Sequence, residues 1–411
     1  MKSVSVVSLI GLMMIFFTTF SLAMEHRLGG NWSTMALTMR NFTGEDQTKA
    51  MNLSQAETIV GIVYTTQISE NLKFVNRFEF SSVWGDEDRF GRIGADGLDL
   101  CITNSYADFD LGPVNFRLGV QDWGFARGFI FDDDFAGAVV TYEVEGFELP
   151  FAWIKGREGG IGKDQSDDDL DYYAISPVFE IGDTASINPY LLYITSSHAG
   201  ESNFDTEEKD GLDVYYLGAD FDLETDSCAL WLTGIWLAGK IDRNEDDDQD
   251  ISAGLAAMGG SVALGDAEIH GEFFYATGQN DEDADMKAFI GPEGNGYAWA
   301  EIMGEGQLDI EVSANSPGPK ITNIMAANIG ASLDVAEEIS VGLDLWYAKF
   351  AEKVEGEYYL GTEIDATVTY ELLEGLELDI IVAYLFAGDA TYKGAHQANP
   401  FEIGTILSFE F

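Results

Sequence analysis

Residues 403–411, IGTILSFEF, carry the pattern that decides the fold of this chain. Read at every second position, one face consists of Phe401, Ile403, Thr405, Leu407, Phe409 and Phe411. The other face consists of Glu402, Gly404, Ile406, Ser408 and Glu410, which are mostly small or charged. Successive side chains of a β-strand point to opposite faces, so the pattern predicts a strand with one apolar and one polar side. A half-buried strand of a soluble sandwich fits this stretch as well.

The first 23 residues resemble a secretory signal peptide. Lys2 gives a positive start, residues 6–20 form an apolar run, and Ser21-Leu22-Ala23 ends in a small-x-small site. We expect cleavage after Ala23. The alternative, a transmembrane helix, needs about 20 apolar residues and a stop-transfer pattern, and neither is present. Residues 24–411 are therefore the part of the chain that folds.

Composition excludes several classes of partner. The chain has 72 acidic and 21 basic residues, a formal net charge of -51. Nucleic acids and anionic lipid headgroups bind clusters of Lys and Arg, so neither is an expected partner. Cys101 and Cys228 lie far apart without a Cys-x-x-Cys motif, which favours structural thiols over a disulfide framework. No motif indicates a cofactor.

The alternation of the C-terminus repeats along the chain. Apolar residues recur at period two in residues 74–84, 116–120, 339–347, 364–370 and 376–386. The connections alternate in length. Short turns are expected near residues 69–71, 111–113, 145–146, 182–184, 265–266, 336–337 and 374–375, and long polar connections near 41–54, 85–96, 122–134, 157–170, 197–210, 240–250, 278–320 and 388–399. A chain that turns tightly at one end and loosely at the other runs up and down.

This organisation favours an outer-membrane barrel over a sandwich. The expected strands have about 10 to 14 residues, whereas sandwich strands typically have about five or six. In a barrel the apolar face meets lipid, every backbone group is paired, and the polar face lines a lumen. We predict an all-β, transmembrane, antiparallel up-and-down barrel over residues 24–411, with about 18 strands (16 as the alternative), short periplasmic turns and long extracellular loops.

The chain resembles bacterial outer-membrane porins, which end in Phe after alternating apolar residues, as Leu407, Phe409 and Phe411 do here. That ending is the expected signal for the barrel-assembly machinery. The resemblance implies the outer membrane of a Gram-negative bacterium, with lipid around the barrel.

A closer likeness is to the alginate export family of eighteen-stranded barrels. Two stretches carry it: FRLGVQDWGFARGFIFDDDFAGAVVTYE (Phe116–Glu143) and LGTEIDATVTYELLEGLELDIIVAYLFAGDA (Leu360–Ala390). A long loop near residues 278–320 also fits. A pore for a polyuronate should hold many Arg and Lys residues, and this chain has few, so the resemblance supports the architecture more than the substrate.

The segment Gly119–Gly137 is the expected constriction, because it combines glycines and aromatics with Arg127 set against three aspartates. Opposed charges in a narrow pore create a transverse field that sorts solutes. The alternative is a surface loop capped by aromatics. The loop near 278–320 is a second candidate, either folding inward or covering the mouth. The expected pore-lining residues are Lys73, Arg77, Glu79, Arg117, Gln121, Trp123, Arg127, Asp132, Asp133 and Asp134.

Acidic runs in the long loops raise the question of Ca²⁺ binding, because carboxylates are the ligands that Ca²⁺ prefers. The candidates are Asp242, Asn244, Asp246 and Asp248, but the EF-hand spacing fails at Asp247 and Ala253. Solvated, mutually repelling loops are the favoured interpretation.

Catalysis is not expected. Of the four histidines, His270 alone lies within a predicted strand, between inward Glu268 and Glu272, and no serine completes a hydrolytic triad. The sequence therefore predicts a non-enzymatic porin for small hydrophilic solutes, with a preference for cations. The alternatives are a substrate-specific oligosaccharide porin, a non-conducting adhesin or sheath, and an outer-membrane hydrolase. The sequence gives neither the solute nor the oligomeric state.

Overall fold

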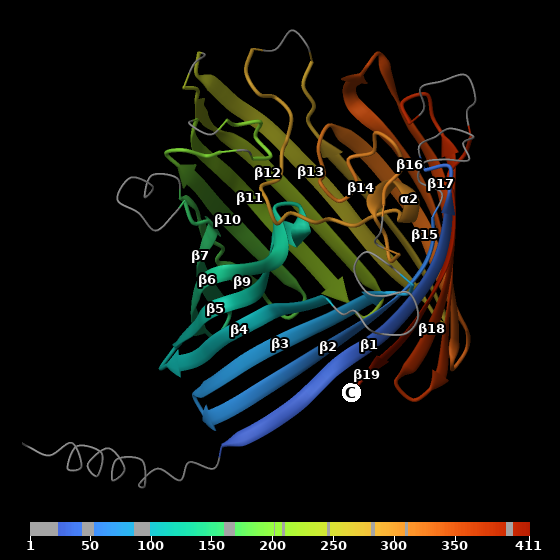
Figure 1. Ribbon diagram of the computed structural model, residues 1–411, viewed down its shortest axis with the longest axis horizontal. Helices are drawn as coiled ribbons and strands as arrows, with labels where there is room; N and C mark the ends of the chain where they lie inside the picture. Colours follow the sequence, from blue (N-terminus) through green and yellow to red (C-terminus); the bar gives the residue numbers. More distant parts are fainter. Residues whose placement is uncertain are drawn as a thin grey trace, which may run out of the picture.

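The computed structural model describes residues 24–42, 53–85, 99–159, 169–200, 202–207, 210–244, 247–280, 284–308, 311–391 and 398–411 (Figure 1). The expected signal peptide, residues 1–23, lies outside the described residues.

Nearly all regular structure is β-strand, as the period-two pattern predicts. The strands are β1 (Glu25–Arg40), β2 (Leu53–Ser69), β3 (Leu72–Val83), β4 (Asp99–Leu111), β5 (Val114–Phe125), β6 (Phe131–Val144), β7 (Phe147–Arg157), β8 (Leu170–Ile175), β9 (Val178–Ile181), β10 (Ala185–Ser196), β11 (Gly211–Thr225), β12 (Cys228–Asp242), β13 (Gln249–Leu264), β14 (Ala267–Ala276), β15 (Ile324–Ala336), β16 (Ile339–Val354), β17 (Glu357–Leu373), β18 (Leu376–Ala387) and β19 (Phe401–Glu410). Two short helices, η1 (Ala126–Gly128) and α2 (Glu301–Gly304), interrupt the pattern. Among the described residues, no helix is long and apolar enough to cross a membrane.

The sheet closes on itself. Each strand pairs with its sequence neighbours in antiparallel register, and β1 pairs with both β2 and β19. Closure leaves no open sheet edge along this seam. The terminal Phe411 continues the pairing, because its N–H and C=O both bond to Gly30, at 3.0 and 2.9 Å.

Strands β8 and β9 are two parts of one barrel strand, because both pair with β7 and β10. Ser176 and Pro177 separate them. Proline has no N–H for the ladder, so it interrupts a strand. The amide of Asn188 on β10 fills the gap by donating to the carbonyls of Ser176 and Pro177 at 3.0 and 2.9 Å. The barrel therefore has 18 strands, as predicted.

The two ends of the barrel differ as expected. Two- or three-residue turns close one end, where the chain also terminates (Figure 1). One of these turns, Asp226–Ser227, is not singled out by the sequence pattern. The other end carries the long connections, with two exceptions: β16 and β17 are joined by a tight turn at Glu355–Gly356, and β5 and β6 are joined by only five residues, 126–130. The end with short turns is called the inner end below, and the opposite one the outer end.

Large apolar side chains cover the outward faces of the strands. Ile403 and Phe409 of β19 are exposed, as is Phe411 just after it, whereas Glu402, next to Ile403, is buried inside the barrel. The alternation of IGTILSFEF therefore separates outside from inside. An outward apolar band over a closed ring of paired strands is the arrangement that hydrocarbon requires.

The inward faces are not uniformly polar, contrary to the sequence prediction. Toward the outer end of β8, β10, β11 and β12, the inward residues Tyr172, Leu192, Val214 and Leu237 are all buried. They belong to an apolar core inside the barrel, built with segments of chain that fold into the lumen. The prediction fails there because a lumen wall covered by other protein groups needs apolar packing instead of hydration.

Candidate pore constriction

The hairpin of β5 and β6 leaves the barrel wall and enters the lumen. Strand β5 pairs with β4 only as far as Val120, and β6 pairs with β7 only from Gly137 onward. Between these positions the two strands pair with each other alone. The departure begins at Gly119, whose φ of 137° and close approach to Ser105 exclude a larger side chain. Figure 1 shows the tip of this hairpin, around η1, within the ring of strands.

One face of this inward hairpin (residues 121–136) is apolar. Phe125 lies 4.8 Å from Tyr190 of β10, and Phe131 lies 6.5 Å from Tyr172 of β8, both between ring centroids. Trp123 packs within the same aromatic cluster, 5.1 Å from Phe125. Aromatic packing therefore holds the hairpin against the lumen side of β8 and β10. Trp123, which was predicted to line the pore, belongs to this packing.

The opposite face of the hairpin carries carboxylates. Asp122 is paired with Asp134, and Gly124 with Asp132, so these residues share the face turned away from the β8–β10 wall. The side chain of Asp122 is 71% exposed. Asn104 of β4 donates to Asp134 at 3.1 Å and to Asp122 at 3.4 Å. The hairpin is thus an amphipathic ribbon with an acidic lumen face.

Two predicted arginines stand at the base of this acidic face. Arg117 lies over the ring of Tyr106 and 3.6 Å from Asp122. Arg77 of β3 is paired in register with Asn104. Both side chains point inward, as the sequence predicts, and both face the acidic side of the hairpin.

The other predicted pore residues have different surroundings. Lys73 forms a 3.0 Å ion pair with Asp108 nearer the inner end, and Glu79 points inward on β3. Gln121 is fully buried and donates to the carbonyls of Arg117 and Gly137, so it stabilises the bend and does not line the pore. The carboxylate of Asp133 accepts a bond from the N–H of Asp134 at 2.7 Å.

The expected opposition of Arg127 to Asp132, Asp133 and Asp134 is wrong. Arg127 lies at the hairpin tip, where its guanidinium reaches across to β11 and bonds to Asp222 at 2.6 Å. Asp132 and Asp134 lie on the acidic face of the ladder behind the tip, whereas Asp133 is paired with Trp123 on the aromatic face.

The second predicted constriction also enters the lumen. Residues 277–323 join β14 to β15 and include α2, and the described residues among them, 277–280, 284–308 and 311–323, are called the inward loop. This inward loop meets the hairpin through two backbone bonds, from Asp132 to Gly294 at 2.7 Å and from Gly296 to Gly128 at 3.2 Å. Phe129 of the hairpin stacks on Tyr297 of the loop at 3.9 Å. The two candidate segments are therefore one assembly.

Carboxylates of the wall hold the inward loop. Glu363 of β17 is completely buried and accepts the N–H groups of Ile302 at 2.5 Å and Met303 at 2.9 Å. Within the loop itself, Glu301 of α2 accepts the N–H of Gln307 at 2.9 Å. Burial raises the pKa of Glu301, although hydrogen bonds from Leu308 and Gln307 oppose that effect. These contacts satisfy backbone donors that a buried loop would otherwise leave unpaired.

Sequence reasoning missed the residues that anchor both segments. Asp220, Asp222 and Glu363 all occupy inward positions of alternating strands, so their orientation was detectable. Their partners were not, because each partner lies on a segment distant in the sequence.

His270 contacts carboxylates. Its Nε2 lies 2.8 Å from Asp344 Oδ1, and its Nδ1 lies 4.0 Å from Glu268. Gly330, between His270 and Asp344 in the sheet, leaves room for this contact, since a Cβ there would lie 2.2 Å from the imidazole. The arrangement extends the acidic lining along β14 and β16.

Two of the four Ca²⁺ candidates form ion pairs with a lysine. Lys240 pairs with Asp242 and, at 2.7 Å, with Asp248, while Asp246 lies outside the described residues. Within the part of the chain that the structure describes, no group of three or more His, Cys, Asp and Glu residues could hold a metal ion. Cys101 and Cys228 are both free and exposed.

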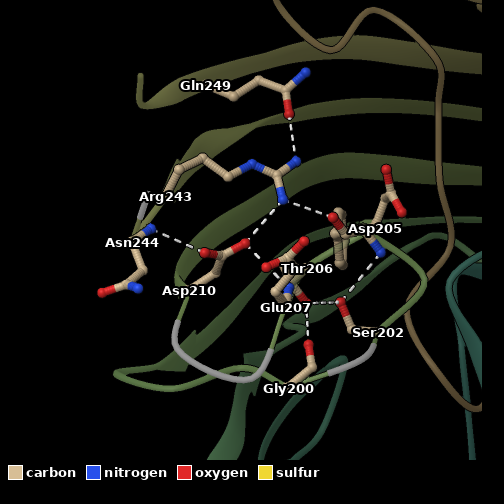
Figure 2. A network of polar contacts seen from close by, with 10 residues as sticks. Gly200, Ser202, Asp205, Thr206, Glu207, Asp210, Arg243, Asn244 and Gln249 are labelled. Carbon is tan, nitrogen blue, oxygen red and sulfur yellow. Dashed lines mark hydrogen bonds and ion pairs between the residues drawn. The ribbon is translucent and has the colours of Figure 1, made fainter. Parts of the chain in front are cut away.

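An ordered network ties two outer-end connections together (Figure 2). Arg243 donates to Asp210 at 2.9 Å and to Gln249 at 2.8 Å, and the N–H of Asn244 donates to Asp210 at 3.0 Å. Burial opposes ionisation of Asp210, but the hydrogen bonds from Glu207, Asn244 and Arg243 outweigh it and lower its pKa. The acidic residue here fixes loop geometry at the mouth.

No family model and no curated protein sequence matches this chain. Solved structures do match in fold. OccAB4 of Acinetobacter baumannii is similar with a TM-score of 0.61 at 11% identity, over 94% of this chain and 98% of that one. OpdK of Pseudomonas aeruginosa, solved with vanillate, gives 0.59 at 8% identity, over 93% and 98%. OccK2 (OpdF) of the same organism, solved with glucuronate, gives 0.59 at 10% identity, over 94% and 96%.

These likenesses establish the fold of an eighteen-stranded porin-type barrel along nearly the whole chain. They do not support the resemblance to the alginate export family.

Proposed function

We propose that this protein is an outer-membrane channel of a Gram-negative bacterium, through which small hydrophilic solutes diffuse without catalysis. The observation that carries the proposal is the amphipathic inward hairpin, which lies in the lumen of a closed barrel and turns the carboxylates of Asp122, Asp132 and Asp134 away from the wall. An apolar exterior and an acidic interior match a lipid surrounding and an aqueous path. The C-terminal strand ending in Phe409 and Phe411 would serve as the signal to the barrel-assembly machinery.

The charges around the inward hairpin favour cations. Inward carboxylates of Glu57, Glu79, Asp122, Asp132 and Asp134 outnumber the guanidinium groups of Arg77 and Arg117. A low-dielectric wall focuses this negative potential on the passing solute. We therefore propose that cationic solutes pass more readily than carboxylates such as vanillate or glucuronate, with which two structural neighbours were solved.

Planar-bilayer recording tests both parts of the proposal. The purified barrel should give ohmic conductance, and in a KCl gradient the reversal potential should move toward the K⁺ equilibrium potential. The preference should decline at 1 M salt, where the Debye length falls to about 3 Å. A properly folded barrel that does not conduct would overturn the channel, and an anion-biased reversal potential would overturn the cation preference.

A further inference from the structure

Arg127 connects the hairpin tip to the part of the wall formed by β11 and β12. Its Nη2 donates to Asp222 Oδ1 at 2.6 Å, and its Nε donates to Thr233 Oγ1 at 3.0 Å. The guanidinium lies 4.0 Å from Asp220 and 5.0 Å above the ring of Trp231. This combination of a planar donor fork and an aromatic face is specific to arginine.

The four contact residues, Asp220, Asp222, Trp231 and Thr233, lie together on the lumen face of β11 and β12 and are called the seat of Arg127. Asp220 is directly opposite Thr233, and Asp222 is opposite Trp231, in the pairing of β11 with β12. Thr233 donates to Asp220 at 2.7 Å, and Tyr190 donates to the same carboxylate at 3.4 Å. Asp220 is only 6% exposed. A carboxylate in that position needs a nearby cation, because burial of an uncompensated charge is strongly destabilising.

The backbone of the tip is strained. Ala126, Arg127 and Gly128 have φ values of 53°, 57° and 83°. Residues other than glycine occupy this region at a cost, and they remain there only when surrounding contacts hold them. Phe129 fixes one side of the tip by stacking on the inward loop. Arg127 fixes the other side to the wall.

We propose that Arg127 is the positioning residue that keeps the inward hairpin across the lumen and thereby sets the width of the channel. The inference rests on the proposed function, because width is read out as conductance. The guanidinium acts through its seat and does not need to touch a solute. Without it, the β11–β12 side of the tip is released while the Phe129 side stays anchored.

Charge alone predicts a different result, which makes the inference testable. Arg127→Ala removes a positive charge, and Asp222→Asn removes a negative one. If the pair merely lines the pore, the two substitutions must shift the reversal potential in opposite directions and leave the open channel equally steady. If the pair positions the hairpin, both must raise the conductance and produce rapid transitions between conductance levels.

The experiment uses the full-length barrel in planar bilayers, with the substitutions alone and combined. We expect a roughly twofold rise in conductance for Arg127→Ala, a smaller rise for Asp222→Asn, and no further rise in the double variant, since both remove one contact. Arg127→Lys keeps the positive charge but lacks the planar donor fork. Its channel should therefore show rapid transitions between conductance levels, as in Arg127→Ala.

Lys155→Ala is the matched control, because Lys155 pairs with Asp169 and Asp171 on the opposite, outward side of the wall. It should leave conductance unchanged. Heat-modifiable migration on gels checks that each variant is a folded barrel. If the wild type conducts but Arg127→Ala and Asp222→Asn are as steady as wild type, the positioning role is wrong and the channel proposal stands. A silent wild type contradicts the channel itself.

Discussion

The two segments that enter the lumen are held in opposite ways. The hairpin of β5 and β6 has its own ladder and extends a charged side chain, Arg127, into carboxylates of the wall. The inward loop has little regular structure, and the wall carboxylate of Glu363 reaches out to its backbone N–H groups. A segment that satisfies its own backbone needs only a side-chain anchor, whereas an irregular one needs acceptors supplied by the wall.

The largest expected effect comes from removing the acceptor that holds the loop. Glu363→Leu leaves the N–H groups of Ile302 and Met303 buried without partners, at about 1–3 kcal/mol each. The inward loop should detach, with lower thermal stability and a conductance rise larger than that of Arg127→Ala.

Glu363→Gln is the matched comparison, because its single amide oxygen can still accept one of the two N–H groups, which bond to separate oxygens of Glu363. Its melting temperature and conductance should lie between those of wild type and Glu363→Leu. Equal losses in the two variants would mean that the charge of Glu363, and not its role as acceptor, holds the loop.

The contact between the two segments gives the next effect. A Cβ on Gly128 would lie 2.6 Å from the carbonyl oxygen of Gly296, and its φ of 83° disfavours other residues. Gly128→Ala should therefore destabilise the tip by about 1–3 kcal/mol and separate it from the loop, which thermal melting and flickering currents would detect. Gly124→Ala on the same hairpin should change neither, because a Cβ there would make only an ordinary contact, 3.5 Å from Asp132 Oδ1.

The acidic lumen face should affect selectivity and not stability. Asp132→Asn with Asp134→Asn removes two exposed charges from the face turned to the lumen. The reversal potential in a KCl gradient should move toward zero, while melting is unchanged. Asp183→Asn, in an inner-end turn, is the control. If the double variant shows the same reversal potential as Asp183→Asn, the acidic face of the hairpin does not determine the ion selectivity.

The smallest effect concerns the network at the mouth. The lowered pKa of Asp210 means that its pairing with Arg243 contributes stability above the ordinary carboxyl value, and this is lost as pH falls through the folded pKa. Residues 197–207 should resist proteolysis from neutral pH down to about pH 4 and become cleavable below it. Asp210→Asn should be cleavable at every pH. If neither the pH decrease nor Asp210→Asn changes the rate of cleavage, the Asp210–Arg243 pair does not hold this segment in place.

Much of the architecture follows from local patterns. The outward positions of every strand face the same kind of environment, so alternation in segments such as residues 339–347 reveals strand and face together. The inner-end turns follow in the same way. The inward positions do not share one environment: Tyr172 packs under the hairpin, whereas Arg77 faces the aqueous side. Their common spacing cannot distinguish the two.

The sequence by itself determined the barrel, its strand number, its apolar exterior and the two segments able to enter the lumen. Each of these features depends on residues that are close together in the sequence. Only the tertiary structure decided that Arg127 sits between Asp222 and Thr233 and not beside Asp132, and that Glu363 holds α2. Those contacts join residues about a hundred or sixty positions apart. Such pairings depend on the closure of the barrel, which brings distant strands around one lumen.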